Sequence, residues 1–233
     1  MTKKYELVLD DTISFWGWKL FRIRALISFG SVEVGDLGGY IEKEENLSHD
    51  GNAWVWGDAK VSGNAEVWGN AEVSGNAEVS GNAKVWGNAE VSGNAWVWGN
   101  AEVSGNAEVS GNAEVWGNAE VWGNAKVWGN AEVSGNTKVS GDAEVSGNAE
   151  VSGNAEVSGN AKVSELGDII VFKNHWSSGR HFTYTKSNKM WKVGCFYGTG
   201  QELIEKAYRD SEKSGNYYKA YVDFVENLEK LGD

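Results

Sequence analysis

Basic, aromatic and amide side chains cluster in one stretch near the carboxyl end of the chain. Between 168 and 200 there is one acidic residue against five lysines and arginines, and two histidines lie among them. Guanidinium, ammonium and amide groups are the donors that bind phosphates and carboxylates in proteins. The sequence therefore predicts an anion site, suited to a phosphate, a nucleotide or an acidic protein partner, on a hairpin that carries Arg180, His181, Tyr184, Lys186, Asn188, Lys189 and Lys192.

The same cations have a plainer interpretation. The segment 51–164 contains fourteen acidic residues against five lysines and supplies most of the net charge of −12. The cations would then pair with the acidic end of that segment, or only solvate a sheet. Both interpretations stay open at the level of sequence.

Candidates for covalent or metal chemistry are few. Cys195 is the one cysteine, so no internal disulfide forms, and its place between Gly194 and Phe196 predicts a buried thiol. The three histidines, His49, His175 and His181, are scattered outside the regular part of the chain. We therefore expect no catalytic residue, no metal site and no cofactor.

The element that must position these groups is a repeat of six residues, Gly-Asn-Ala-x-Val-(Ser or Trp), which occurs nineteen times without an insertion between 51 and 164. A short fixed period is typical of a solenoid, because each unit buries its apolar residues only by stacking on its neighbours. Alternation in Ala-x-Val-(Ser or Trp) predicts a short strand with Ala and Val inward, and Gly-Asn turns the corner. Thr137 alone breaks the alanine column, and stacked asparagines should share amide hydrogen bonds.

Read from its valine, the unit resembles the hexapeptide repeat of left-handed parallel β-helix proteins. The resemblance implies a triangular coil of three units, so that residues eighteen apart lie directly above one another. Outward glutamates then form columns, one of Glu72, Glu90 and Glu108 and another of Glu114, Glu132 and Glu150. The resemblance also implies a homo-oligomer, a trimer first and a dimer as the alternative.

Many proteins of this fold are acyltransferases, which resemble one another in a histidine base within the coil and a loop over the acyl-donor groove. The repeat here has no histidine and no loop, so we expect a protein that is not an enzyme. An acyltransferase-like activity, with His49, His175 or His181 as the base, is the alternative.

Tryptophan is the exception within the repeat. Nine tryptophans fall at outward positions, and they are absent from the last six units. Exposed aromatic surface on this scale predicts self-association along the rod or a platform for a partner, with ordinary surface packing as the alternative. The residues concerned are Trp54, Trp56, Trp68, Trp86, Trp96, Trp98, Trp116, Trp122 and Trp128.

The two ends differ from the repeat. We expect a β hairpin over 1–31, with strands at 5–10 and 19–27 around a turn at Trp16-Gly17-Trp18. The solenoid then covers 32–164, with an irregular first coil at 32–50 and regular units over 51–164. In the first coil Ile41 and Leu47 fall in the alanine column and His49 in the valine column, so that these residues cap the core.

The segment 165–233 reads as a small α+β domain. Three strands are expected over 168–174, 180–186 and 190–197. Thr199 and Glu202 have the spacing of a capping box and predict a first helix, and a second is expected after Gly215-Asn216. The predicted fold class is thus mainly β, a parallel solenoid with an amino-terminal hairpin and a three-stranded, two-helix cap.

Segments in both ends and the repeat, among them Gly35 to Tyr40 and Ser187 to Thr199, are similar to a group of phage- and prophage-encoded hexapeptide-repeat proteins. That resemblance implies a setting, infection of a bacterium, without a mechanism. The expected function is a non-catalytic binding or scaffold protein whose ends recognise or sequester a host component, such as a defence protein or a nucleotide signal, with a purely structural phage protein as an alternative. No signal peptide or membrane span is expected, the acidic rod is a poor ligand for nucleic acid, and the host cytoplasm is the expected location.

Overall fold

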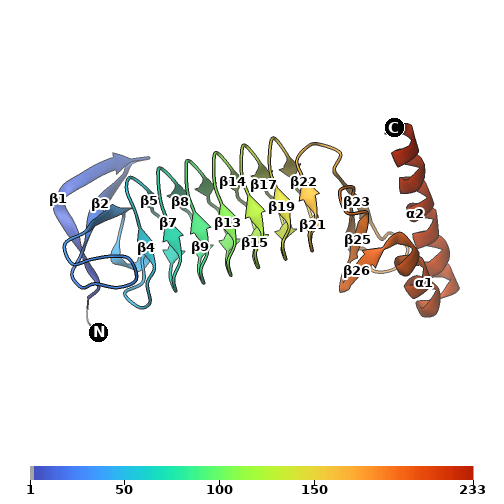
Figure 1. Cartoon of the computed structure of the whole chain (residues 1–233), viewed down its shortest axis with the longest axis horizontal. Coiled ribbons are helices and arrows are strands. Elements are labelled where there is room, and N and C mark those ends of the chain that lie inside the picture. Colours follow the sequence, from blue (N-terminus) through green and yellow to red (C-terminus); the bar gives the residue numbers. More distant parts are fainter. Residues whose placement is uncertain (1–2, 233) are drawn as a thin grey trace.

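A computed structural model describes residues 3–232 and shows a long β solenoid with a separate folded segment at each end (Figure 1). The amino-terminal segment consists of β1 (Tyr5–Phe15), β2 (Trp18–Ala25), β3 (Leu37–Ile41) and the short helix η1 (Glu44–Asn46). The carboxyl-terminal segment consists of β23 (Ile169–Lys173), β24 (His181–Thr185), β25 (Met190–Val193), β26 (Phe196–Thr199), α1 (Gly200–Asp210) and α2 (Glu212–Gly232).

Between these ends, each repeat unit forms a strand of two residues, the variable residue and the valine. The strands are β4 (Trp54–Val55), β5 (Lys60–Val61), β6 (Glu66–Val67), β7 (Glu72–Val73), β8 (Glu78–Val79), β9 (Lys84–Val85), β10 (Glu90–Val91), β11 (Trp96–Val97), β12 (Glu102–Val103), β13 (Glu108–Val109), β14 (Glu114–Val115), β15 (Glu120–Val121), β16 (Lys126–Val127), β17 (Glu132–Val133), β18 (Lys138–Val139), β19 (Glu144–Val145), β20 (Glu150–Val151), β21 (Glu156–Val157) and β22 (Lys162–Val163).

Every third strand pairs with the next in parallel, with residues eighteen apart in register, as Val91 pairs with Val109. Three sheets result, one running from β4 to β22, one from β5 to β20 and one from β6 to β21. The solenoid has about seven turns, and the prediction of a mainly β, parallel solenoid is confirmed.

The core of the solenoid contains the repeat's alanines and valines, which are at most 1% exposed. Thr137 takes one alanine position, where its hydroxyl donates to the carbonyl oxygen of Ser134 at 2.6 Å and so stays satisfied. Glycine is required at the corners: Gly99 has a φ of 73°, and a Cβ there would lie 3.1 Å from the backbone of Gly117. The predicted asparagine ladders are confirmed, for example Asn82 to Asn100 at 2.9 Å.

The amino-terminal hairpin turns at Trp16 and Gly17 as predicted, although β1 extends to Phe15. Strand β3 then joins the hairpin to the solenoid, because it pairs antiparallel with β2 and parallel with β5. The predicted phase of the first coil is wrong. Ile41 pairs with Val61, and Leu47 bridges to Val67, so both lie in the valine column at a spacing of twenty residues.

The cause of this shift is the corner after Leu47. Val55 follows Leu47 by eight positions, whereas successive valines of the repeat are six positions apart. The two additional residues form a wider bend. His49 lies in that bend and not in a strand, so its assignment to the valine column is also wrong. It is a cap residue nonetheless, since its ring stacks on Tyr5 with centroids 4.3 Å apart.

The carboxyl-terminal sheet has four antiparallel strands in the order β23-β24-β25-β26, so the expectation of three strands is wrong. Gly194 has a φ of 57° and, with Cys195, makes a tight turn that divides the expected third strand into β25 and β26. Cys195 is therefore exposed at a hairpin tip, and the prediction of a buried thiol is wrong.

The two predicted helices are present, and the capping box at Thr199 and Glu202 is confirmed. Helix α2 begins at Glu212, earlier than expected, so Gly215 lies inside it. The helix needs glycine there, because a Cβ would come within 2.2 Å of the Tyr208 ring on α1. Over residues 3–232, none of the helices is long and apolar enough to cross a membrane.

The carboxyl-terminal sheet closes the last turn of the solenoid. Backbone N–H groups that would donate to a further turn donate to side chains, Glu156 to the Thr183 hydroxyl at 2.9 Å and Lys162 to the Ser187 hydroxyl at 2.8 Å. The opposite face of the sheet packs on α1 and α2 around Phe182 and Trp191. Both ends of the apolar core are thereby covered.

Candidate binding surface

The tryptophans after the valines form stacks along the solenoid. Trp68 and Trp86 lie parallel, with ring centroids 5.0 Å apart and planes 2° from parallel, and Trp98 and Trp116 repeat this geometry at 5.0 Å and 4°. The stacking follows from the repeat, because residues eighteen apart occupy the same position in successive turns. The indole faces therefore align along the rod as ladders.

Two tryptophans beyond these stacks are more exposed, Trp122 by 46% and Trp128 by 41%. Trp122 belongs to the same sheet as Trp68 and Trp86, with Ser104 in the intervening turn. We refer to Trp68, Trp86 and Trp122 as the tryptophan column. It is an aromatic strip along one edge of the solenoid.

One of the nine tryptophans does not contribute to an exposed surface. Trp54 is fully buried beneath the amino-terminal segment, where Tyr5 and Phe29 pack against its ring. Trp56 is half-buried, as Trp68 and Trp86 are, and donates from Nε1 to Glu72 at 3.1 Å. The expectation of an outward aromatic surface is wrong for Trp54, because the hairpin and the loop after it fold over the first turn.

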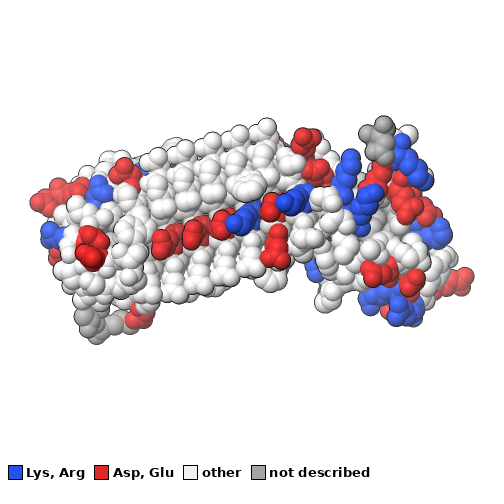
Figure 2. Space-filling model, viewed as in Figure 1, with Lys and Arg blue, Asp and Glu red and all other residues white. Residues whose placement is uncertain are grey.

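On the face drawn in Figure 2, charged side chains form a row along the rod, between uncharged parts of its surface. Lysines in such columns pair with a glutamate in the neighbouring turn, as Lys126 does with Glu108 at 2.9 Å and Lys138 with Glu120 at 3.1 Å. The column Glu114, Glu132 and Glu150 contains no cation. There burial, and next the charge of Glu132, raise the pKa of Glu114.

The structure does not bring all of the predicted anion-binding residues together. Arg180 and His181 lie at the start of β24, whereas Lys186 follows its end, roughly 20 Å away at the usual rise per residue of a strand. Tyr184 is buried and donates to Glu229, and Lys189 pairs with the same carboxylate at 3.5 Å.

Two further members of the predicted set contact the solenoid. Lys192 lies 3.7 Å from Glu156 and so pairs with the acidic end of the rod. Asn188 donates to Asn160 at 3.2 Å and to the Tyr197 hydroxyl at 3.0 Å. Lys186 and Lys189 remain exposed at the turn between β24 and β25, together with the half-buried Asn188.

His49 lies at the amino-terminal end of the solenoid, whereas His175 and His181 lie at one end of the β23–β24 hairpin, where His181 pairs with Lys173. His49 accepts at Nδ1 from the backbone N–H of Lys4 at 3.2 Å, and His175 lies 3.3 Å from the Tyr221 hydroxyl.

Within residues 3–232, no group of three or more His, Cys, Asp or Glu side chains has an arrangement that could hold a metal ion. His49 Nε2 does lie 3.7 Å from the Glu44 carboxylate, and both residues line a cavity of about 780 Å³ together with Glu45, Asp50 and Glu66.

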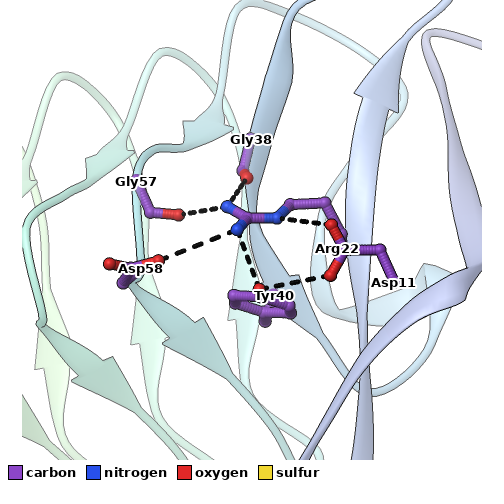
Figure 3. A network of polar contacts seen from close by, with 6 residues as sticks. All are labelled: Asp11, Arg22, Gly38, Tyr40, Gly57 and Asp58. Atoms are coloured by element: carbon purple, nitrogen blue, oxygen red, sulfur yellow. Dashed lines mark hydrogen bonds and ion pairs between the residues drawn. The ribbon is translucent and has the colours of Figure 1, made fainter.

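A polar network that the sequence did not reveal joins the hairpin to the rod (Figure 3). Arg22 donates to the carbonyl oxygens of Gly38 at 2.9 Å and Gly57 at 2.8 Å. Its remaining donors reach Asp11 and the Tyr40 hydroxyl, and Asp58 lies 3.8 Å away. The one available signal was Asp58 itself, which replaces asparagine at a repeat corner.

Burial and charge act in opposite directions on the pKa of Tyr40 in the Arg22 network. Burial raises the pKa of Tyr40, and the guanidinium of Arg22 over its ring, at 4.2 Å, opposes that shift. The network fixes the hairpin's position relative to the second corner of the solenoid.

No protein-family model matches this chain, and no curated protein is significantly similar to it in sequence.

Proposed function

We propose that this chain is a non-catalytic scaffold and binding protein, a left-handed β-helix of hexapeptide units that assembles through its tryptophan column. The observation that carries the proposal is the alignment of Trp68, Trp86 and Trp122 along one edge, with Trp122 46% exposed. Stacked indoles offer a large apolar area at little cost in side-chain entropy, which suits an interface between rigid surfaces. A trimer around that edge is the expected assembly.

The rod suits a scaffold because it has no insertion and a uniform core. Its turns are joined by backbone ladders and asparagine ladders, which make a stiff spacer between two different ends. A surface that repeats along a rod binds best to another rod with the same spacing, and a second copy of this chain has that spacing.

The assembly is tested by native mass measurement on a triple variant, Trp68→Ser, Trp86→Ser and Trp122→Ser. Serine is the residue that the repeat itself places at this position, so the rod should fold. We expect the wild type to be a trimer and the variant a monomer of about 25 kDa. The double variant Trp98→Ser and Trp116→Ser is the matched control and should remain assembled. A monomeric wild type, or an assembled triple variant, contradicts the proposal.

The setting is proposed from the resemblance to phage-encoded hexapeptide-repeat proteins: the assembled rod acts in the cytoplasm of an infected bacterium, and its ends bind a host component. The exposed Lys186 and Lys189 at one end would suit an anionic group such as a nucleotide phosphate. A Lys186→Ala, Lys189→Ala variant titrated with cyclic and linear nucleotides tests this part. Unchanged nucleotide binding would place the anion elsewhere.

A further inference from the structure

Helix α2 has two apolar faces, of which one packs within the molecule and the other is largely exposed. Tyr218, Val222 and Val225 form the packed face, which is buried against the carboxyl-terminal sheet and α1. The second face follows the helix at spacings of three, four and three residues. We refer to it as the outer stripe, and it consists of Tyr221, Phe224, Leu228 and Leu231.

The outer stripe is most exposed toward the carboxyl end of α2. Tyr221 is half-buried, because its ring contacts that of Phe172 with centroids 4.9 Å apart. Phe224 is 50% exposed and Leu231 is 82% exposed. Large apolar side chains that align on one exposed face indicate an interaction surface. Helix α2 lies on the side of the sheet away from the solenoid, so this surface belongs to the far end of the molecule (Figure 1).

The spacing of the outer stripe indicates the kind of partner. Apolar residues that alternate between spacings of three and four turn one face of a helix toward a second helix with the same spacing. The order three, four, three also reads the same in both chain directions. A second copy of α2 therefore matches the stripe in an antiparallel arrangement, in which Phe224 meets Leu228 of the second copy and Tyr221 meets Leu231.

Charged residues beside the outer stripe favour this antiparallel arrangement. Asp223 and Lys230 lie on the same side of α2, about two helical turns apart. When Phe224 meets Leu228 of the second copy, Asp223 of each copy comes level with Lys230 of the other. Two contacts between opposite charges result, whereas a parallel arrangement would place each lysine beside its own counterpart.

Lys230 has no such contact within one chain. Its Nζ lies 3.5 Å from the amide oxygen of Asn227, and no carboxylate among residues 3–232 lies within ion-pair distance of it. Asp223 pairs with Lys219 at 2.6 Å and can accept from a second cation, since a carboxylate has two oxygens. The antiparallel arrangement thus supplies the carboxylate that Lys230 lacks.

From this complementarity we infer that α2 pairs with α2 of a second copy of this chain, antiparallel across a two-fold axis. Each copy contributes the same side chains, so the contact is self-complementary and closes at two copies. The overlap from Tyr221 to Leu231 covers about 16 Å of helix. A contact of this length buries less than the roughly 800 Å² per partner of a standard interface, and we expect a dissociation constant on the order of 0.1 mM.

This contact goes beyond the proposed assembly, because it uses the carboxyl-terminal segment instead of the tryptophan column on the rod. At low micromolar concentration the α2 helices are mostly unpaired, so the native mass measured there reports the tryptophan column alone. At higher concentration α2 links the carboxyl-terminal ends of two molecules.

The test is sedimentation equilibrium of the full-length triple variant Trp68→Ser, Trp86→Ser and Trp122→Ser, which separates this contact from the rod interface. Between about 5 µM and about 500 µM we expect the mass to rise from a monomer of about 25 kDa toward a dimer. Adding Leu231→Asp should weaken this association by about tenfold or more, because it places a charge in the apolar contact. The exposure of Leu231 allows this variant to fold.

An exchange of charges tests the antiparallel arrangement. Asp223→Lys and Lys230→Asp should each weaken the association by about threefold, since each places like charges opposite one another, and the two together should restore it. Glu226→Lys is the matched control. It makes the same change of charge as Asp223→Lys, but Glu226 lines a cavity with Gln201 on another side of α2, so the association should stay unchanged.

The inference is overturned if the triple variant stays monomeric up to about 500 µM, which would leave the outer stripe to a helix of another protein. It is also overturned if Leu231→Asp has no effect, or if the paired exchange of Asp223 and Lys230 fails to restore the association. The two assemblies fail separately. A wild type that is monomeric at low micromolar concentration but dimerises through Leu231 at high concentration contradicts only the assembly through the tryptophan column.

Discussion

Tyr197 of the carboxyl-terminal sheet lies directly over Gly159, in the place that the next glycine corner of the rod would occupy. A Cβ added to Gly159 would lie 2.1 Å from the Tyr197 hydroxyl oxygen, whereas glycines in earlier turns face the glycine eighteen residues later. The solenoid thus ends where an aromatic ring from another fold replaces a backbone corner. This contact, with the hydrogen bonds from Glu156 and Lys162, joins the rod to its cap.

Gly159→Ala should therefore destabilise the junction. The backbone at Gly159 has a φ of 67°, so alanine adds both strain and a clash with Tyr197. Gly153→Ala is the matched control, because its φ is 72° and a Cβ there meets nothing within 4 Å. We expect Gly153→Ala to lower the free energy of unfolding by about 1 kcal/mol and Gly159→Ala by about 3 kcal/mol.

Thermal unfolding and limited proteolysis measure the two effects. Proteolysis of Gly159→Ala should release the segment 165–233 from an intact rod, and Gly153→Ala should resist this cleavage. Equal stability of the two variants would show that Tyr197 moves aside without cost.

The Arg22 network predicts that replacing Arg22 with a side chain of the same charge but another shape lowers the free energy of unfolding. Arg22→Lys keeps the cation but cannot reach the carbonyl oxygens of Gly38 and Gly57 together with Asp11. We expect the free energy of unfolding to fall by about 2 kcal/mol in chemical denaturation. Arg24→Lys, which alters an exposed pair with Glu6, is the control and should cost less than about 0.5 kcal/mol. Similar losses in both variants would contradict a special role for Arg22.

The repeat made the rod predictable in detail. A period of six with no insertion dictates which residues are buried, and a register of eighteen places Trp68 on Trp86 and Asn82 on Asn100. These relations depend only on local conformation repeated many times. Tertiary context has little opportunity to override them.

The ends were less predictable, because each depends on contacts between distant segments. Two additional residues after Leu47 shift the first coil, and nothing in the local pattern marks them as a bend. The burial of Trp54 requires the hairpin above it, and the exposure of Cys195 requires a turn at Gly194 inside an apolar run. The dispersal of the predicted anion-binding residues likewise reflects partners such as Glu229 and Glu156 that lie far away in sequence.

Lys4 predicts an unusual dependence of stability on pH. Its side chain is 1% exposed and donates to the Ala53 carbonyl oxygen at 2.8 Å. Burial lowers its pKa from 10.5 to about 8, against the opposing effect of Asp50. Between these two values the unfolded chain binds more protons than the folded chain, so the free energy of unfolding rises with pH across this window.

We expect a rise of about 2 kcal/mol between roughly pH 7.5 and pH 9.5, measured by urea unfolding. The range stops there because burial raises the pKa of Tyr5 and Tyr184, whose ionisation in the unfolded chain acts in the opposite direction above about pH 10. Lys4→Met should abolish the rise, and Lys3→Met, at an exposed pair with Glu44, should retain it. A flat profile for the wild type would contradict the assignment.

Replacing one glutamate of the acidic column on the β5–β20 sheet should stabilise the rod. Glu132 faces Glu114 and Glu150 in successive turns, and like charges directly opposite each other on a sheet repel. Glu132→Lys converts this arrangement into the alternation already present at Glu120, Lys138 and Glu156. We expect the free energy of unfolding to increase by about 0.5 kcal/mol at low ionic strength, and the raised pKa of Glu114 to fall.

The reverse substitution is the control for Glu132→Lys. Lys138→Glu extends the acidic row to four successive turns, from Glu102 to Glu156, and removes the pair with Glu120 at 3.1 Å, so it should destabilise the rod by at least a similar amount. Both effects should shrink in about 1 M salt, where charges interact over only about 3 Å, whereas a change caused by packing would persist. Denaturation of both variants at two salt concentrations separates these causes. If the free energy of unfolding changed with the same sign in both variants, side-chain packing and not the order of charges would decide the stability of these columns.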